Sequence, residues 1–157
     1  QTGAPIPDEL IQKLDKAKKF NQGFTNMELL SAAILDLEWH AQKDTSKLDV
    51  NEFEKATLTK IGLIPEIIVR YRSTNFGHVF TSDYYAAGYY SYTWSAVLDA
   101  DAFDVFAKKG LFDPASAKSF RENVLAPGGK EDPMDMYKRF RGREPKVDAL
   151  LKRNGFK

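Results

Sequence analysis

Five of the chain's seven tyrosines lie between Phe76 and Trp94, together with one of its two histidines. They flank the tripeptide Ala86-Ala87-Gly88 and are Tyr84, Tyr85, Tyr89, Tyr90 and Tyr92. A tyrosine hydroxyl is protonated at neutral pH and donates a hydrogen bond to a developing oxyanion, but it hydrolyses nothing unaided. The stretch therefore predicts half of a catalytic site or an aromatic binding surface, unless the rings serve only as core.

The zinc-hydrolysis motif H-E-x-x-H does not occur in the sequence. In that motif two histidines four positions apart on a helix face one metal, and the glutamate activates its water. Here the only histidines are His40 and His78, and they lie far apart in the chain. We therefore expect no complete metal site within this chain, and a packing or hydrogen-bonding role for His40.

Three other groups of residues have simpler explanations than a catalytic, phosphate-binding or metal-binding role. Hydroxyl residues surround His78, but no G-x-S-x-G elbow accompanies them. The basic cluster at residues 138–143 could contact phosphates, yet the helix dipole alone favours cations at a helix C-terminus. Asp99, Asp101 and Asp104 diverge around a helix, so we expect a solvated face there rather than a metal site.

Length and composition narrow the class of protein. A chain of 157 residues suits one domain, and a domain of this length can bury a core. The net charge of +1 gives no reason to expect a nucleic-acid or membrane partner, because such partners favour a basic surface. The absence of cysteine excludes disulfides and thiol catalysis but leaves the compartment open.

Apolar periodicity predicts helices and no strands, and therefore an all-helical domain of about seven helices with short connections. Four are expected at residues 8–19, 25–42, 51–61 and 87–109. Three shorter ones are expected to start at Asp113-Pro114, Asp132-Pro133 and Glu144-Pro145. Thr25 with Glu28, and Asn51 with Glu54, have capping-box spacing. The apolar run at residues 67–69 is assigned to neither helix nor strand.

The tyrosine stretch contains His78-Val79-Phe80, then Tyr85-Ala86-Ala87-Gly88-Tyr89-Tyr90-Ser91-Tyr92, then Trp94. This order resembles the H-x-F-x-G-G-Y-A-A-G-Y-Y-x-Y-x-W signature of the oligopeptidase A, thimet oligopeptidase and peptidyl-dipeptidase Dcp family of zinc metallopeptidases. The resemblance spans the whole chain and includes the closing Phe140-Arg141-Gly142-Arg143-Glu144-Pro145. Within the family, Arg70-Tyr71-Arg72-Ser73 is more similar to the bacterial peptidyl-dipeptidase branch, which removes C-terminal dipeptides.

Full chains of that family are several times longer, and their H-E-x-x-H helix and third zinc ligand, a glutamate, lie upstream of the matching region. The resemblance therefore implies that residues 1–157 are a C-terminal segment of a peptidase catalytic domain. It implies zinc in the full-length enzyme but none bound by this chain, short peptides as substrates, and the upstream part of the same polypeptide as partner. The segment alone is expected to be inactive.

The resemblance also implies roles for individual residues. Tyr92 matches the tyrosine that donates to the oxyanion of the tetrahedral intermediate, and Tyr89 matches a neighbouring site tyrosine. His78 matches the histidine that binds substrate near the scissile bond, and Tyr85 the loop tyrosine that closes over it. Where the family has glycines, this chain has Thr81-Ser82-Asp83-Tyr84, one residue longer. Tyr84 is therefore the alternative to Tyr85, and fewer glycines imply a stiffer loop.

The competing interpretation is a stand-alone helical binding module whose aromatic surface stacks on a ligand without catalysis. An upstream reading frame that encodes H-E-x-x-H would decide for the peptidase.

Overall fold

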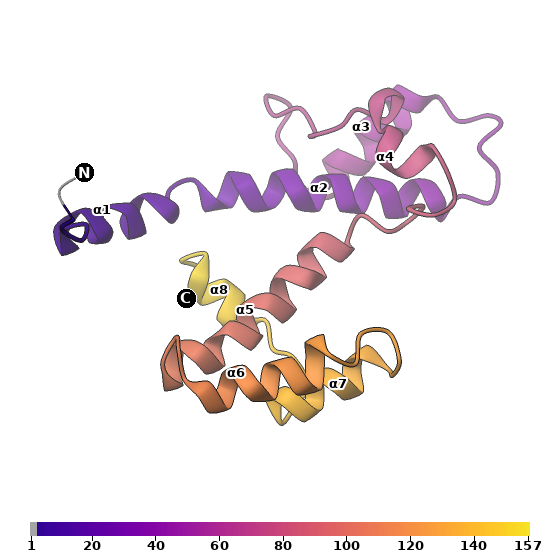
Figure 1. The fold of residues 1–157 in the computed structure, drawn as a ribbon. Helices are drawn as coiled ribbons and strands as arrows, with labels where there is room; N and C mark the ends of the chain where they lie inside the picture. The colour runs from indigo at the N-terminus through magenta and orange to yellow at the C-terminus, as the bar shows by residue number, and fades with distance from the viewer. Residues whose placement is uncertain (1–2) are drawn as a thin grey trace. The chain divides into compact units, whose positions relative to one another are not determined.

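The computed structural model describes residues 3–157, and the regular secondary structure in that range is entirely helical (Figure 1). The helices are α1 (Asp8–Lys18), α2 (Gln22–His40), α3 (Val50–Lys60), α4 (Gly77–Phe80), α5 (Ser91–Lys109), α6 (Pro114–Phe120), α7 (Pro133–Arg141) and α8 (Asp148–Arg153). A 3₁₀ turn, η1 (Ser73–Asn75), precedes α4, and a π-helical segment, η2 (Arg121–Leu125), follows α6. The predicted all-α class is confirmed; the helix that the sequence did not indicate is the single turn α4.

The chain divides into two compact units. One is Phe20–Trp94, and the other combines the described part of Gln1–Lys19 with Ser95–Lys157. The boundary falls inside α5, directly after the tyrosine stretch. The expectation of a single domain stays a prediction.

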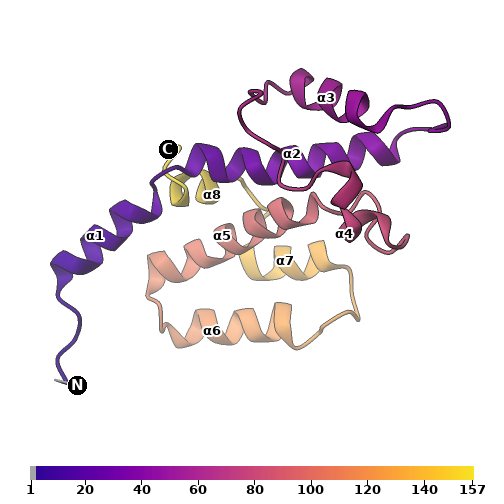
Figure 2. The same ribbon diagram turned by 90° about the horizontal axis from the view of Figure 1, so that it is seen from above.

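In the unit Phe20–Trp94, α3 lies along α2 (Figure 2), and the core forms where α4 meets α2. Ala32 and Ala33 of α2 pack against Phe76, Val79 and Tyr89, and all five side chains are buried. Small alanine side chains leave room for the large rings to approach the helix closely. This packing fixes the one-turn α4, which is too short to be stable alone.

A buried glutamate holds the segment that leads into α4. Glu54 of α3, 5% exposed, accepts hydrogen bonds from the backbone N–H of Ser73 at 2.6 Å and from its hydroxyl at 2.8 Å. Glu54 also pairs with Arg72. The indole N–H of Trp39 donates to the same Ser73 hydroxyl at 2.9 Å. The irregular chain before α4 is thereby attached to both α2 and α3.

Some predicted helix boundaries are wrong. The predicted capping box of Asn51 with Glu54 does not begin α3; Asp49 caps this helix by accepting the N–H groups of residues 51 and 52. Helix α2 begins at Gln22 rather than Thr25, after Asn21 in the left-handed region. Helix α5 begins at Ser91, because Ala87 has a φ of 57° and cannot be part of a right-handed helix. The last helix also starts later than expected, at residue 148.

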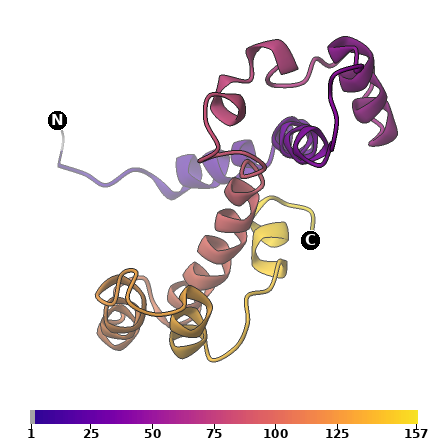
Figure 3. The same cartoon turned by 90° about the vertical axis from the view of Figure 1, so that its right-hand side faces the viewer.

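Asp113 and Asp132 cap α6 and α7 as predicted, each with proline in the first helical turn. In their unit, η2 lies beside α7, and both are drawn in orange tones in Figure 3. The rings of Phe106, Phe120 and Phe140 meet at centroid distances of 5.0 to 6.2 Å. This aromatic cluster joins α5, α6 and α7.

Asp101 of α5 is not on a solvated face as expected, because it is only 2% exposed. Its carboxylate accepts hydrogen bonds from the Tyr137 hydroxyl at 2.7 Å and from the Arg143 guanidinium at 2.6 and 2.9 Å. Arg141 donates to the Asp101 carbonyl at 2.9 Å and to Asp104 at 2.9 Å. The arginines at the end of the basic cluster are therefore occupied by carboxylates, which accounts for them without a phosphate.

Opposing effects act on the pKa of Asp101. Burial raises this pKa, but the hydrogen bonds from Arg143 and Tyr137 and the charge of Arg141 outweigh burial, so the pKa is lowered below its ordinary value. Burial and the bond to Asp101 raise the pKa of Tyr137. The charged carboxylate is thus the form that the folded unit stabilises.

In residues 3–157, none of the helices has the length and apolar character that crossing a membrane requires.

Asp101→Asn is expected to lower the free energy of unfolding by about 3 kcal/mol at neutral pH, because it leaves buried partners of a charge uncompensated. Since folding lowers the pKa of Asp101, its contribution is present above about pH 4 and is lost as the pH falls through the folded-state pKa. Urea unfolding at pH 7 and pH 3 should show the wild-type advantage shrinking in acid. Asp99 lies on the same helix as Asp101, and Asp99→Asn removes only an exposed pair with Arg153 of α8, so it should change little. An equal effect of both variants would contradict this account.

Candidate active site

Four of the predicted site residues form one cluster of rings around His78. The His78 ring stacks on Tyr85 at a centroid distance of 4.9 Å with 15° between the planes. Tyr89 meets His78 edge-on at 5.5 Å, and Tyr92 lies 6.1 Å from it. Tyr89 and Tyr92 contact each other at 5.1 Å. The structure therefore brings together the histidine and three tyrosines that the sequence singled out.

The cluster joins buried and exposed rings. Tyr89 is 6% exposed and belongs to the core, where its ring also meets Phe76 at 5.1 Å. Tyr85 and Tyr92 are 50% and 51% exposed, and His78 is exposed as well. Two half-exposed tyrosines and a histidine thus stand on a buried aromatic base. Such a surface can stack on a ligand and present phenol hydroxyls to it.

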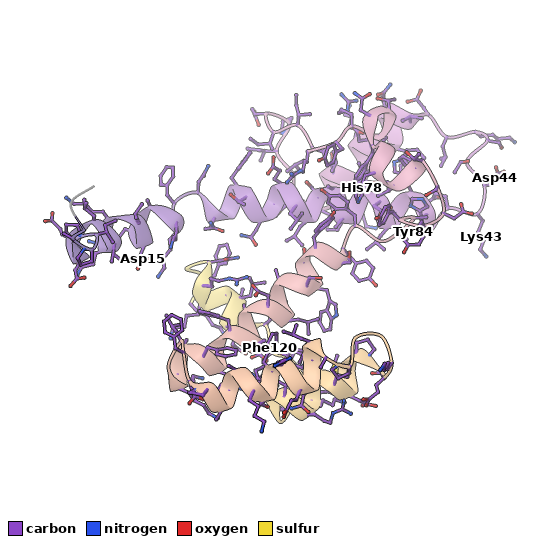
Figure 4. All side chains as sticks on the ribbon, viewed as in Figure 1. Asp15, Lys43, Asp44, His78, Tyr84 and Phe120 are labelled. Carbon is purple, nitrogen blue, oxygen red and sulfur yellow. The ribbon has the colours of Figure 1, made fainter. Side chains whose placement is uncertain are left out.

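Helix α4 sets the position of His78. Val79, the next residue, is fully buried against α2 and fixes α4 there. His78 is thereby turned outward, where Tyr85 covers one face of its ring. Figure 4 marks His78 on α4 and Tyr84 on the loop that follows. The imidazole contacts the rings of three tyrosines, which restrict its rotation.

The structure separates the two alternative loop tyrosines. Tyr84 is 86% exposed and packs edge-on with Tyr85 at a centroid distance of 5.1 Å. Tyr85 is the one that stacks on His78. The geometry therefore favours Tyr85 as the loop tyrosine, and its role in binding stays a prediction.

A tight turn connects Tyr85 to the helix that carries Tyr92. The N–H of Gly88 donates to the carbonyl of Tyr85 at 3.0 Å. A Cβ atom at position 88 would lie only 3.1 Å from that carbonyl oxygen, so the turn has little room for a side chain here. Ala87 precedes it in the left-handed region. The Ala-Ala-Gly tripeptide therefore forms a tight turn with a defined backbone conformation.

The sequence interpretation gave no role to Asp36, a fully buried residue of α2. Its carboxylate accepts the N–H of Ala87 at 3.1 Å and the N–H of Tyr89 at 2.9 Å. The available signal was an aspartate between Leu35 and Leu37 in an apolar stretch of helix, because a buried carboxylate requires partners. The sequence does not say which partners they are.

The electrostatics of the cluster keep Tyr89 neutral. Burial raises the pKa of Tyr89, and the nearby charge of Arg70 lowers it by less, so the net shift is upward. The Arg70 guanidinium lies 5.6 Å from the centroid of the Tyr71 ring, and the Tyr71 and Tyr89 rings meet edge-on at 6.2 Å. Tyr89 is therefore a protonated phenol over the whole physiological pH range.

The residues present do not form a zinc site. Between residues 3 and 157, no three His, Cys, Asp or Glu side chains lie close enough together to hold a metal ion. The ring neighbours of His78 are tyrosines, and His40 is engaged with Asp36. The aromatic cluster can bind and orient a ligand, but it offers no metal-binding set.

Comparison with known proteins identifies the family. Residues 1–156 match Peptidase family M3. The chain belongs to this family. It is 40% identical over 157 residues to a dipeptidyl carboxypeptidase of Escherichia coli and 39% identical over 156 residues to an oligopeptidase A of Haemophilus influenzae. Oligopeptidase A of Escherichia coli is 38% identical over 160 residues. The predicted family is confirmed, and a binding module without catalysis is not favoured.

These alignments cover 99%, 99% and 100% of the chain but only 23% of each relative. Relatives named as oligopeptidase A and as dipeptidyl carboxypeptidase match almost equally well. The identities therefore do not decide between similarity to an oligopeptidase A and similarity to a dipeptidyl carboxypeptidase.

Tyr89→Ala is expected to lower the free energy of unfolding of the unit Phe20–Trp94 by about 3 to 5 kcal/mol, because it empties a buried ring position beneath His78. Tyr84→Ala removes an exposed ring of the same type and should change stability by less than about 0.5 kcal/mol. Chemical denaturation followed by circular dichroism measures both. Comparable losses in the two variants would show that the described burial is wrong.

Proposed function

We propose that this chain is part of a zinc metallopeptidase that hydrolyses short oligopeptides, as a peptidyl-dipeptidase, and that it supplies the substrate-binding and oxyanion-stabilising side of the cleft. Membership of Peptidase family M3 supports the reaction class. The single observation that carries the proposal is the convergence of His78, Tyr85, Tyr89 and Tyr92 in one half-exposed cluster. These are the residues whose types suit binding a peptide and stabilising negative charge.

The positions of the rings suggest a division of tasks. Tyr92 lies in the first turn of α5 and is half exposed, so its hydroxyl can donate to an oxygen that becomes negative during attack on a peptide carbonyl. His78 can hydrogen-bond a substrate carbonyl with the edge of its ring while Tyr85 covers one face. Tyr89 is buried beneath them and contacts both His78 of α4 and Tyr92 of α5, so it fixes the positions of these two rings relative to each other.

Zinc enters the proposal through the family, which is one of zinc metallopeptidases. Because residues 3–157 bring no three potential ligands together, we assign the metal to an upstream part of the same polypeptide and none of the described residues to its coordination. This segment therefore contributes no zinc ligand in our proposal. It binds the peptide, orients its carbonyl and donates a hydrogen bond.

Tyr92→Phe in the complete polypeptide is expected to lower kcat by about a hundredfold, the usual cost of losing one oxyanion donor. KM should change little, because the hydroxyl acts in the transition state rather than in the ground state. Steady-state hydrolysis of a fluorogenic oligopeptide measures both constants. Tyr90→Phe is the matched control, since Tyr90 is equally exposed, at 52%. An unchanged kcat in Tyr92→Phe would remove Tyr92 from the mechanism.

The 157 residues produced alone are expected to bind no stoichiometric zinc and to cleave no peptide, whereas the complete polypeptide does both. Elemental analysis of the purified proteins and a peptidase assay with added Zn²⁺ provide the measurements. One equivalent of zinc, or turnover by residues 1–157 alone, would overturn the assignment of the metal to another part of the protein.

A further inference from the structure

The carboxylate of Asp36 connects α2 to the turn between two site tyrosines. It accepts one hydrogen bond from Ala87 N–H through Oδ1 at 3.1 Å and another from Tyr89 N–H through Oδ2 at 2.9 Å. The partners are 51 and 53 positions away in the sequence. Since Asp36 is 0% exposed, water does not compete for these bonds, and each is stronger than it would be at the surface.

The turn that Asp36 holds has an unfavourable backbone conformation. Ala87 has a φ of 57°, a region that costs an alanine roughly 1 kcal/mol or more and that only surrounding interactions maintain. In this conformation the two N–H groups on either side of Gly88 both point at one carboxylate. Without the carboxylate, the buried Tyr89 donor and the partly buried Ala87 donor would lose their acceptor, and the turn would relax.

His40 completes the environment of the carboxylate. Its Nδ1 lies 2.8 Å from Asp36 Oδ1 and 2.9 Å from the Asp36 carbonyl oxygen. Both neighbours are acceptors, so Nδ1 carries a proton and donates. The His40 ring stacks on Phe80 of α4 at 5.4 Å. His40 thus connects Asp36 to Phe80 on α4, the helix that carries His78.

We infer that Asp36 is a positioning residue of the site: it fixes the 87–89 turn and so sets the distances from Tyr85, Tyr89 and Tyr92 to His78. It touches no substrate in this account and acts only through the turn. Its effect on turnover rests on the proposed function, whereas its effect on the turn does not. Asp36→Asn is the sharpest variant, because it keeps the side-chain volume and one oxygen but turns the other acceptor into a donor that faces an N–H group.

Residue-resolved amide hydrogen exchange on the complete polypeptide tests the positioning directly. In Asp36→Asn, exchange of the Ala87 and Tyr89 amides should accelerate by at least about tenfold, while the amides of α3 stay unchanged. Glu54→Gln is the matched control, since Glu54 is also a buried carboxylate that accepts a backbone N–H, but at Ser73. It should accelerate Ser73 and leave Ala87 and Tyr89 unchanged. Unchanged exchange at Ala87 and Tyr89 in Asp36→Asn, or acceleration throughout the unit, would overturn the inference.

Kinetics test the consequence for the reaction. Asp36→Asn should lower kcat by roughly tenfold to a hundredfold with a smaller change in KM, because displaced catalytic groups cost rate more than binding. Faster exchange at the turn with an unchanged kcat would overturn the role of Asp36 in the reaction. If the wild-type polypeptide cleaves no peptide, the proposed function fails, and the exchange result alone decides the inference.

A measurement on the unaltered protein covers the case in which Asp36→Asn does not fold. In the wild type, the Ala87 and Tyr89 amides should exchange at least about ten times more slowly than the amide of exposed Tyr84, because only a buried acceptor protects them. Equal rates at the three positions would overturn the inference without any substitution.

Discussion

Buried carboxylates on helices hold the parts of this chain that are not helical. Asp36 of α2 accepts the N–H groups of the 87–89 turn, and Glu54 of α3 accepts the N–H of Ser73. Asp101 of α5 binds Arg143, which follows α7. A helix satisfies its own backbone, whereas an irregular segment needs acceptors from elsewhere. In each case the carboxylate is almost completely buried, so removing it takes an acceptor away from donors that are buried or partly buried.

The tyrosine cluster combines a buried core ring with half-exposed rings. Tyr89 is core by burial, and its ring packs with Phe76 above the alanines of α2. Tyr85 and Tyr92 are half exposed and contact the same histidine that Tyr89 supports. A rigid aromatic base beneath exposed phenols is what a binding site needs, since hydroxyls that must meet a developing charge lose effectiveness if they have to reorganise. Burial of one ring thus holds the others where the proposed function requires them.

Sequence reasoning succeeded where the determinants are local. Asp113 and Asp132, each followed by proline, cap helices as predicted, and the 3.6-residue period located α1, α2 and α5. The choice of His78, Tyr85, Tyr89 and Tyr92 came from a compact stretch and from its resemblance to a family. Two of the failures involve partners distant in sequence. The late start of α5 depends on a turn held by Asp36, and Asp101 is buried because arginines some forty positions later reach it. No local pattern carries that information.

The loop between α4 and Tyr85 leads into a turn that is fixed from α2. Residues 81–84 follow α4 directly, and the last of them, Tyr84, is 86% exposed. Tyr85 keeps its stack on His78 because the turn beyond it is fixed independently from α2. A loop whose distal end is attached to a buried carboxylate can vary in length on its proximal side without moving the rings that follow. The turn held by Asp36 therefore positions Tyr85 beside His78 without a glycine among residues 81–84.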